Sequence, residues 1–228
     1  MLDRGFCSVV GKRKLLPSKL SRKLMHIGVG PLYMLCWPLY NSSRASPLIC
    51  ASVPLAASLH FYLVGKGVIN DQSLIAGTTR SGDRRELLHG PLQYGIIHAA
   101  ATLLFWRNSP VGITALSILC GGDGLAEVIG SSVRSKKLPY NSDKSVAGTA
   151  ACFLGGLAFS VPLLLYYQQL GLLTAPASLP ALNISRLLAG AALCSAVGAA
   201  VESAPLRNLD NVAVTVAVAA AARAYFGF

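Results

Sequence analysis

The chain has 228 residues, of which 53% are hydrophobic and only 13% are charged. Soluble domains carry about 25% charged residues, so this composition excludes an ordinary soluble fold and indicates a membrane protein. The formal net charge is +11, but the positive charges lie between apolar segments and not on a basic, aromatic-rich helix, so no nucleic-acid partner is expected.

The N-terminal segment of the chain is strongly basic. Residues 1–23 carry seven Lys and Arg residues and a single acid, Asp3. This segment is either a basic flank of a membrane helix or the remnant of an organellar transit peptide, which is typically basic and poor in acids. The rest of the chain, residues 24–228, is expected to form one membrane-embedded domain.

Seven apolar segments follow one another along this domain. A membrane span needs about 20 apolar residues, and strand-like alternation is absent, so we predict an all-α, polytopic membrane protein with about six or seven transmembrane helices. The first segment is short and contains Pro31 and Pro38, so it is expected to be tilted or incomplete. The predicted segments are 24–40, 47–64, 87–106, 110–131, 145–167, 184–203 and 209–226.

The segments between these helices alternate in charge. Sixteen of the 20 Lys and Arg residues lie in 1–23, 65–86, 132–144 and 204–208, and the other four lie in the opposite connections or the C-terminal tail. Because cytoplasmic loops are rich in Lys and Arg, this bias places the N-terminus on the cytoplasm-like side. Three polar clusters fall on the same side, and we expect them to converge on one pocket at the membrane interface.

The first polar cluster leads into the third apolar segment. Its charged residues either are exposed to solvent, where they contribute to membrane topology and pair with one another, or support a substrate. A histidine at the helix entrance can titrate or hydrogen-bond a substrate hydroxyl. The candidate substrate or supporting residues are Arg80, Asp83, Arg84, Glu86 and His89. The remaining histidines, His26, His60 and His98, are interpreted as packed side chains.

The second cluster places two carboxylates inside a long apolar helix. Asp123 and Glu127 are four residues apart and therefore share one helix face. Ionisable groups at membrane depth are costly and usually functional, and carboxylates suit Mg²⁺ bound together with substrate phosphates. Both are candidate catalytic residues, and the alternative is a structural ion pair with a loop Lys or Arg. Gly121, Gly122 and Gly124 allow close approach of another backbone or a phosphate to this acid.

A cationic loop and a helix start follow this pair of acids. Ser145 is a natural N-cap, and a helix N-terminus offers free amides to a phosphate. Lys144 adds a positive charge and is a further candidate catalytic residue. The predicted nucleotide- or phosphate-binding residues are Gly122, Gly124, Arg134, Lys136, Lys137, Ser145 and Gly148. The alternative is a capped helix beside an ordinary positive loop.

The third cluster joins the sixth apolar segment to the seventh. Glu202 and Asn211 are predicted to support the substrate, and Asp210 is predicted to bind a metal together with Asp123. Glu127 and Glu202 are further candidates for that metal. The signatures of soluble nucleotide-binding proteins are absent from the sequence, among them the P-loop, the dinucleotide fingerprint and the protein-kinase set.

Several short runs occur in a specific order along the chain. They are Arg85-Glu86-Leu87-Leu88-His89-Gly90-Pro91-Leu92, Phe105-Trp106-Arg107, Cys120-Gly121-Gly122-Asp123-Gly124, Lys137-Leu138-Pro139-Tyr140-Asn141, Lys144-Ser145 with Ala147-Gly148, and Val201-Glu202-Ser203. Together they resemble plant phytol and farnesol kinases of the polyprenol kinase family, which includes dolichol kinase. The resemblance covers about residues 80–228, whereas residues 1–79 match loosely through Arg22-Lys23 and His26.

The resemblance implies a multi-helix membrane enzyme that phosphorylates an isoprenoid alcohol, with CTP rather than ATP as the donor. Phytol kinases act at chloroplast membranes, where phytol is salvaged for tocopherol synthesis. We therefore expect a Mg²⁺- and CTP-dependent phytol kinase at a chloroplast membrane, or alternatively at the endoplasmic reticulum. The alternative is a kinase that uses farnesol or geranylgeraniol as the acceptor. A membrane cytidylyltransferase and an anion transporter rank lower.

Three positions depart from the pattern of this family. Val146 stands where relatives have Trp, Leu209 replaces the first acid of an Asp-Asp-Asn run, and Thr215 stands in place of a Pro. The change at Leu209 bears on activity and on nucleotide preference if the missing acid is a metal ligand.

Overall fold

The computed structural model describes residues 18–175, 181–205 and 209–228, so the basic segment predicted over 1–23 falls largely outside the described residues. Helices dominate: α2 (Ser18–Cys36), α3 (Ser46–Lys66), α4 (Gln72–Thr78), α5 (Gly90–Phe105), α6 (Pro110–Ser117), α7 (Gly124–Ser132), α8 (Val146–Gln169), α9 (Ile184–Glu202) and α10 (Asp210–Phe226). The shorter elements are the 3-10 helices η1 (Trp37–Leu39) and η2 (Arg84–Leu88), the π-helical η3 (Ile118–Asp123), and strands β1 (Lys137–Leu138) and β2 (Asn141–Ser145).

Helices occupy all seven predicted apolar segments. α6, η3 and α7 form one continuous helical stretch, Pro110–Ser132, which matches the predicted segment 110–131. By length and composition, four helical stretches among the described residues can cross a membrane, whereas α5 and α10 are shorter, with 16 and 17 residues. The count of six or seven spans stays a prediction. The four long stretches are Ser46–Lys66, Pro110–Ser132, Val146–Gln169 and Ile184–Glu202.

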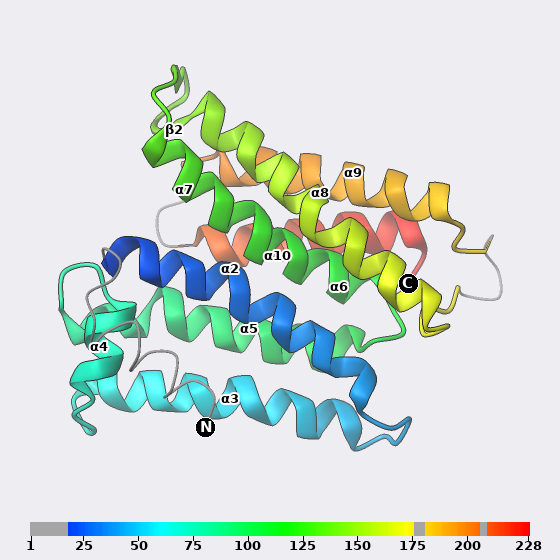
Figure 1. Cartoon of the computed structure of the whole chain (residues 1–228), viewed down its shortest axis with the longest axis horizontal. Helices are drawn as coiled ribbons and strands as arrows, with labels where there is room; N and C mark the ends of the chain where they lie inside the picture. Colours follow the sequence, from blue (N-terminus) through cyan, green and yellow to red (C-terminus); the bar gives the residue numbers. More distant parts are fainter. Residues whose placement is uncertain (1–17, 176–180, 206–208) are drawn as a thin grey trace.

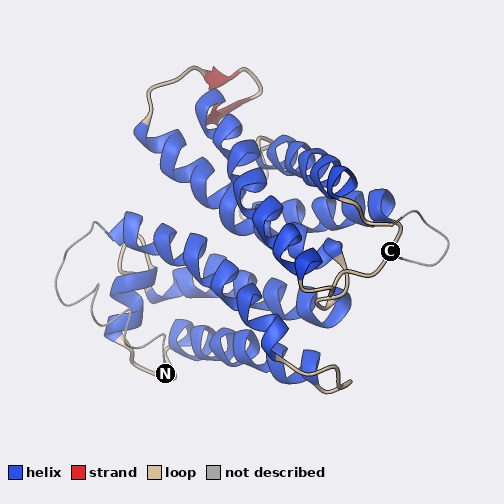
Figure 2. Cartoon of the chain, turned by 45° about the vertical axis from the view of Figure 1, so that its right-hand side comes forward, coloured by secondary structure: helices blue, strands red, loops and turns tan. Residues whose placement is uncertain are grey.

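The helices run along the long axis of the molecule in two groups (Figures 1 and 2). In one group α3 packs along α5, and in the other α8 packs against α7 and α9 while α9 packs against α10. α2 contacts α7 and η3 and so joins the groups. Small residues allow this close packing: a Cβ added at Gly156 of α8 would lie 2.7 Å from Ser195 Oγ of α9.

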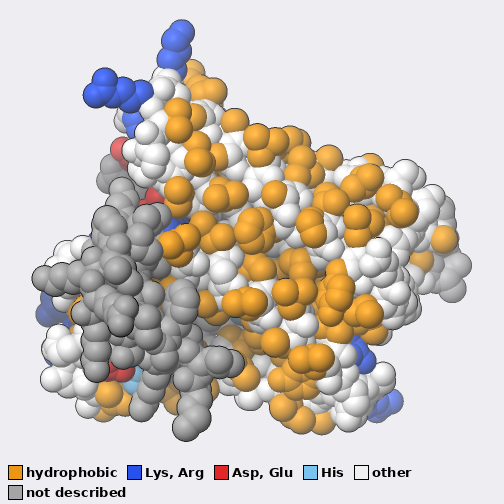
Figure 3. Space-filling view, in the orientation of Figure 1, with side chains coloured by type: hydrophobic (Ala, Val, Ile, Leu, Met, Phe, Trp, Pro, Cys, Tyr) orange, Lys and Arg blue, Asp and Glu red, His pale blue; other side chains and the backbone are white. Residues whose placement is uncertain are grey.

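The charged connections gather at one end of the bundle, as predicted. The start of α2, η2, the β1–β2 hairpin, the end of α9 and the start of α10 all lie at the left end of Figure 1. Between the ends, apolar side chains cover much of the face seen in Figure 3. Leu48, Leu154 and Val216 on the outer faces of α3, α8 and α10 are each more than 60% exposed. Such faces suit contact with lipid tails.

The opposite end of the bundle holds a structural arginine. Arg107 is buried, and its guanidinium donates hydrogen bonds to the backbone carbonyls of Trp37 and Pro38, each at 3.3 Å, and to that of Tyr40. The guanidinium thus ties together the carbonyls of the turn where α2 ends, one of which, that of Trp37, also accepts from the Tyr40 amide.

Three local features differ from the sequence prediction. The first helix begins by Ser18, earlier than residue 24, and α4 was not predicted. The connection 132–144, expected to be a plain cationic loop, contains an antiparallel hairpin. Tyr140 donates its hydroxyl hydrogen to Ser203 Oγ at 2.8 Å, and Asn141 Nδ2 donates to the Ser203 carbonyl at 2.9 Å. This docking on α9 fixes the hairpin through partners that the local sequence does not reveal.

Candidate active site

A cavity of about 1620 Å³ lies at the charged end of the bundle. Residues from all three predicted polar clusters line it, so the expected convergence on one pocket is found in the structure. The predicted residues in its wall are Arg80, Glu86 and His89 of the first cluster, Asp123, Glu127, Lys137, Lys144, Ser145 and Gly148 of the second, and Glu202, Asp210 and Asn211 of the third.

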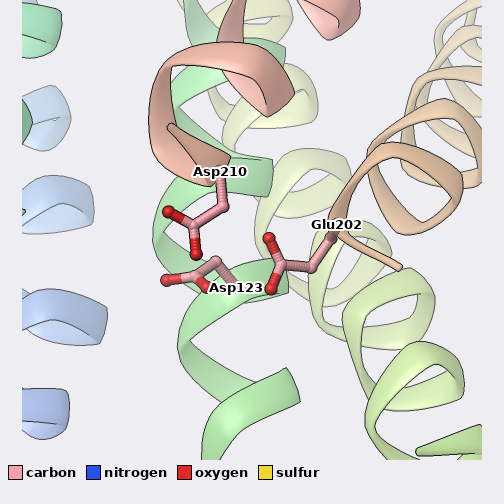
Figure 4. Close-up of side chains that lie close together, drawn as sticks. All are labelled: Asp123, Glu202 and Asp210. Atoms are coloured by element: carbon pink, nitrogen blue, oxygen red, sulfur yellow. The ribbon is translucent and has the colours of Figure 1, made fainter. Parts of the chain in front are cut away.

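Three carboxylates from different helices face one another in this cavity (Figure 4). One oxygen each of Asp123, Glu202 and Asp210 lies within 4.8 Å of the others. Asp123 and Glu202 are only 7% and 4% exposed. Asp210 stands in the first turn of α10, where the helix dipole favours a negative charge. Carboxylates this close disfavour one another's ionisation unless a cation compensates them.

Lys144 supplies part of that compensation from the hairpin. Its ammonium donates a hydrogen bond to Glu202 Oε1. Burial lowers the pKa of Lys144, but the carboxylates of Glu202, Asp123 and Asp210 outweigh this effect and raise it above the usual value. Lys144 therefore carries its charge at neutral pH.

The donor set of the carboxylate cluster fits a divalent cation. Glu202 Oε2 is buried and has no hydrogen-bond partner among the described residues, although buried acceptors are normally satisfied. Mg²⁺ prefers oxygen ligands and is commonly bound through one or two carboxylates with substrate phosphates. Asp123 and Asp210 were the predicted metal ligands, and of the two further candidates the structure groups Glu202 with them.

Two residues of α2 contact the acids of η3 and α7 and were missed as site residues. Lys23 Nζ lies 3.2 Å from Asp123 Oδ2 and 2.6 Å from Glu127 Oε2. His26 Nε2 lies 3.2 Å from the same Asp123 oxygen and 3.1 Å from the Leu119 carbonyl. Because both neighbours are acceptors, Nε2 carries the hydrogen and donates it. The sequence contains a pattern that could have identified them, because Lys23 and His26 are three residues apart and so share one face of a helix that enters the membrane.

The other two histidines that were interpreted as packed differ in their surroundings. His98 is buried, and its Nδ1 lies 2.8 Å from the carbonyl of Tyr94. His60 lines the cavity and lies 3.2 Å from Asp71 Oδ2. His98 lines the same cavity as His60, and His26 contacts the catalytic candidate Asp123 there, so the packed interpretation is not confirmed for any of the three.

Removal of Lys23 should destabilise the protein. In Lys23→Met we expect a loss of about 3–5 kcal/mol, because Asp123 and Glu127 then lose a buried cationic partner. Thermal unfolding in detergent measures this loss. The double variant Lys23→Met/Glu127→Gln should recover part of it, and Lys66→Met at the exposed end of α3 should melt like the parent protein. Equal melting of Lys23→Met and the parent would contradict the ion pairs.

The phosphate-binding prediction for the hairpin region divides into two parts. Ser145 is the N-cap of α8, since its Oγ accepts from the Gly148 amide at 3.2 Å, and both residues line the cavity with Lys137. Arg134 and Lys136 are not among the residues that line it. Lys137 is thus placed to meet an anion, whereas Arg134 and Lys136 lie away from the cavity wall. The first three amides of α8 already donate to the Lys136 carbonyl, Ser135 Oγ and Ser145 Oγ.

The glycines around Asp123 serve helix packing. A Cβ added at Gly122 would lie 3.1 Å from the Cys152 carbonyl of α8, and one at Gly124 would collide with Ile27 of α2. Neither glycine lines the cavity. The structure thus shows the predicted close approach of another helix at both glycines, and nucleotide binding by Gly122 and Gly124 stays a prediction.

Glu86 holds the first cluster together. Its carboxylate accepts from the backbone amides of Arg80 at 2.6 Å and Ser81 at 3.0 Å. Burial raises the pKa of Glu86, but these hydrogen bonds outweigh burial and lower it below the usual value. Arg80 also reaches Glu127 Oε2 at 3.5 Å, so Glu86 positions a residue that touches the second cluster.

The remaining predicted residues of this cluster have different environments. Asp83 caps η2 by accepting from the Arg85 amide at 2.9 Å, and Arg84 lies against Gly67 at the end of α3. Neither lines the cavity, whereas His89 does. The structure thus gives Asp83 and Arg84 local contacts outside the site.

The departure at Leu209 does not interrupt the carboxylate cluster. Leu209 is 58% exposed and stands directly before Asp210. Asp123, Glu202 and Asp210 assemble without a contribution from position 209.

Fold and site together define a helical protein with membrane-compatible helices and a cavity of buried acids and cations at one end. No family model and no solved structure matches the chain. It is 37% identical to "Probable phytol kinase 1, chloroplastic" of Glycine max over 95% of this chain and 70% of the relative, and 38% identical to "Phytol kinase 1, chloroplastic" of Arabidopsis thaliana over the same shares.

A third relative is "Farnesol kinase, chloroplastic" of Arabidopsis thaliana, with 40% identity over 73% of this chain and 54% of that protein. The chain belongs to the phytol kinase family, with farnesol kinase among its relatives. The similarity extends over nearly the whole chain and therefore includes most of residues 1–79, for which the resemblance in short motifs was loose.

Proposed function

We propose that this protein is a phytol kinase, which transfers the γ-phosphoryl group of CTP to the hydroxyl of phytol. The observation that carries the proposal is the convergence of three carboxylates, two of them buried, with Lys144 and Lys137 in one cavity. Relatives at 37% and 38% identity are named phytol kinases. The CTP donor rests on the family resemblance.

In the proposed reaction the alcohol oxygen bonds to the γ-phosphorus while the bond from that phosphorus to the bridging oxygen breaks. CDP leaves, and the hydroxyl proton passes to a carboxylate of the cavity. Such a transfer depends mainly on positioning and charge stabilisation. Lys144 and Lys137 would hold the phosphate oxygens.

Asp123, Glu202 and Asp210 would hold Mg²⁺, which when bound neutralises charge on the nucleotide phosphates. Lys144 would keep the Glu202 carboxylate in place through its ion pair. Lys23 and His26 would orient Asp123 from the side of α2.

We further propose a chloroplast membrane as the location and phytol salvage for tocopherol synthesis as the role. The relatives carry "chloroplastic" in their names. The cavity would open on the side that carries most of the Lys and Arg residues. Farnesol is the second candidate acceptor, because a relative at 40% identity is named farnesol kinase.

The test is phosphoryl transfer in membranes that contain the protein, with phytol and farnesol as acceptors. CTP labelled in the γ-phosphate should give labelled phytyl phosphate, whereas CTP labelled in the α-phosphate should leave the lipid unlabelled. Label from the α-phosphate in the lipid would instead indicate a cytidylyltransferase. UTP and ATP as donors test nucleotide preference. No labelled lipid from any alcohol would contradict the kinase proposal.

A further inference from the structure

One arm of the cavity leaves the charged site and runs between α2, α3 and α5. We call it the tail arm. α2 contributes Val29 and Tyr33, which are four residues apart and so share a face. α3 contributes Val53 and Ala57, also four residues apart, and α5 contributes Tyr94. Mostly apolar side chains thus continue the same cavity that holds the carboxylates at its other end.

The tail arm is deep and has a fixed floor. Tyr33 lies ten residues beyond Lys23 along α2, which corresponds to ~15 Å of helix rise. Val53 lies thirteen residues before the end of α3 at Lys66, or ~20 Å, and α2 and α3 run in opposite directions (Figure 1). The Tyr33 hydroxyl lies 2.8 Å from Thr102 Oγ1 and donates to the Cys50 carbonyl at 3.2 Å. These bonds hold the ring in place.

The walls of the tail arm are mostly apolar and still accessible, with His60 of α3 and His98 of α5 as polar exceptions in the lining. Val29 is 42% exposed and Val53 is 58% exposed, although both line this cavity at membrane depth. Apolar surface that faces a cavity favours an apolar occupant over water, and sites for small molecules are mostly apolar with a few polar groups at one end. A long apolar chain that ends in one polar group matches this arrangement.

We propose that the tail arm binds the isoprenoid chain of the alcohol substrate and that Val53, beside the Tyr33 floor, limits the length of that chain. The hydroxyl then lies at the Asp123 end of the cavity. This inference rests on the proposed function, because it assigns the acceptor of the same site. Residues of α2 and α3 would thus determine which alcohol is used, whereas η3, α9 and α10 carry the carboxylate cluster.

The test fills the deep end of the arm and compares acceptors of different length. In Val53→Trp, kcat/KM for phytol should fall about tenfold or more relative to the parent protein. The kcat/KM for farnesol, which is shorter by one isoprene unit, should fall less, and that for geraniol, which is shorter by two, should be nearly unchanged. Leu55→Trp is the matched control, since Leu55 is 46% exposed on the same helix and does not line the cavity. An equal loss for all three alcohols, or no loss for phytol, would overturn the inference.

A binding measurement separates this inference from the proposed function. A phytol analogue with a diazirine at the end of its chain is crosslinked to the parent protein in membranes, and the labelled peptides are mapped by mass spectrometry. Labelling near Val53 or Tyr33 that excess phytol suppresses is the expected result, and it would stand even if no phosphoryl transfer were detected. Labelling confined to other helices, or labelling that phytol does not suppress, would overturn the inference.

Discussion

Asp123→Asn is expected to abolish phosphoryl transfer, with a loss of about 10³-fold or more in kcat. The substitution removes the charge of the carboxylate that joins the Glu202 and Asp210 cluster to Lys23 and His26. The fold should survive, because Lys23 keeps Glu127 as an ionic partner at 2.6 Å. The measurement is transfer from γ-labelled CTP to phytol, with the amount of inserted protein quantified in the same membranes.

Asp83→Asn is the control for Asp123→Asn. Asp83 caps η2 outside the cavity, and asparagine caps helices as well as aspartate does. This variant should therefore keep nearly full activity. Full activity of Asp123→Asn in well-inserted protein would remove Asp123 from the catalytic role. Binding of Mn²⁺ to the purified protein, followed by electron paramagnetic resonance, should weaken in Asp123→Asn and not in Asp83→Asn.

Lys144→Met is expected to lower kcat by about 10²-fold. It removes the cation that meets both Glu202 and the proposed phosphate position, and it leaves Glu202 buried without its ionic partner. Lys136→Met makes the same change of charge on the same hairpin but away from the cavity wall, and it should stay close to the parent activity. Equal losses in the two variants would indicate a general effect of positive charge and contradict a specific role for Lys144.

The double variant Lys144→Met/Glu202→Gln separates stability from catalysis. Lys144→Met alone should lower the melting temperature in detergent, and removing the uncompensated carboxylate as well should restore it but not the activity.

The pH dependence of the stability that Lys144 contributes has a defined sign, because the pKa of Lys144 is raised in the folded protein. Its stabilising contribution is fully present below the usual lysine pKa of about 10.4 and is lost only as the pH rises through the higher folded value. Lys144 should therefore contribute no titration near neutral pH.

The sequence by itself determined the features that depend on local pattern. Runs of apolar residues predicted the positions of the seven helical segments, and the distribution of Lys and Arg predicted which connections gather at one end. The spacing of Asp123 and Glu127 predicted that they share a face, and both contact Lys23. Ser145 was predicted to cap α8 and does so. Each of these features follows from neighbours a few residues apart.

The tertiary structure alone decided which of these polar groups meet. Lys23 reaches Asp123 across 100 positions of the chain, and Glu202 joins Asp123 and Asp210 because α9 and α10 pack beside η3. The same packing turns Gly122 and Gly124 toward neighbouring helices and away from the cavity. Hydropathy and residue spacing show which polar and apolar side chains share a face of one helix. They carry no information on which face of another helix packs against it. That choice depends on how small and large side chains interlock across the bundle, and it places the acids, the cations and the apolar arm in one cavity.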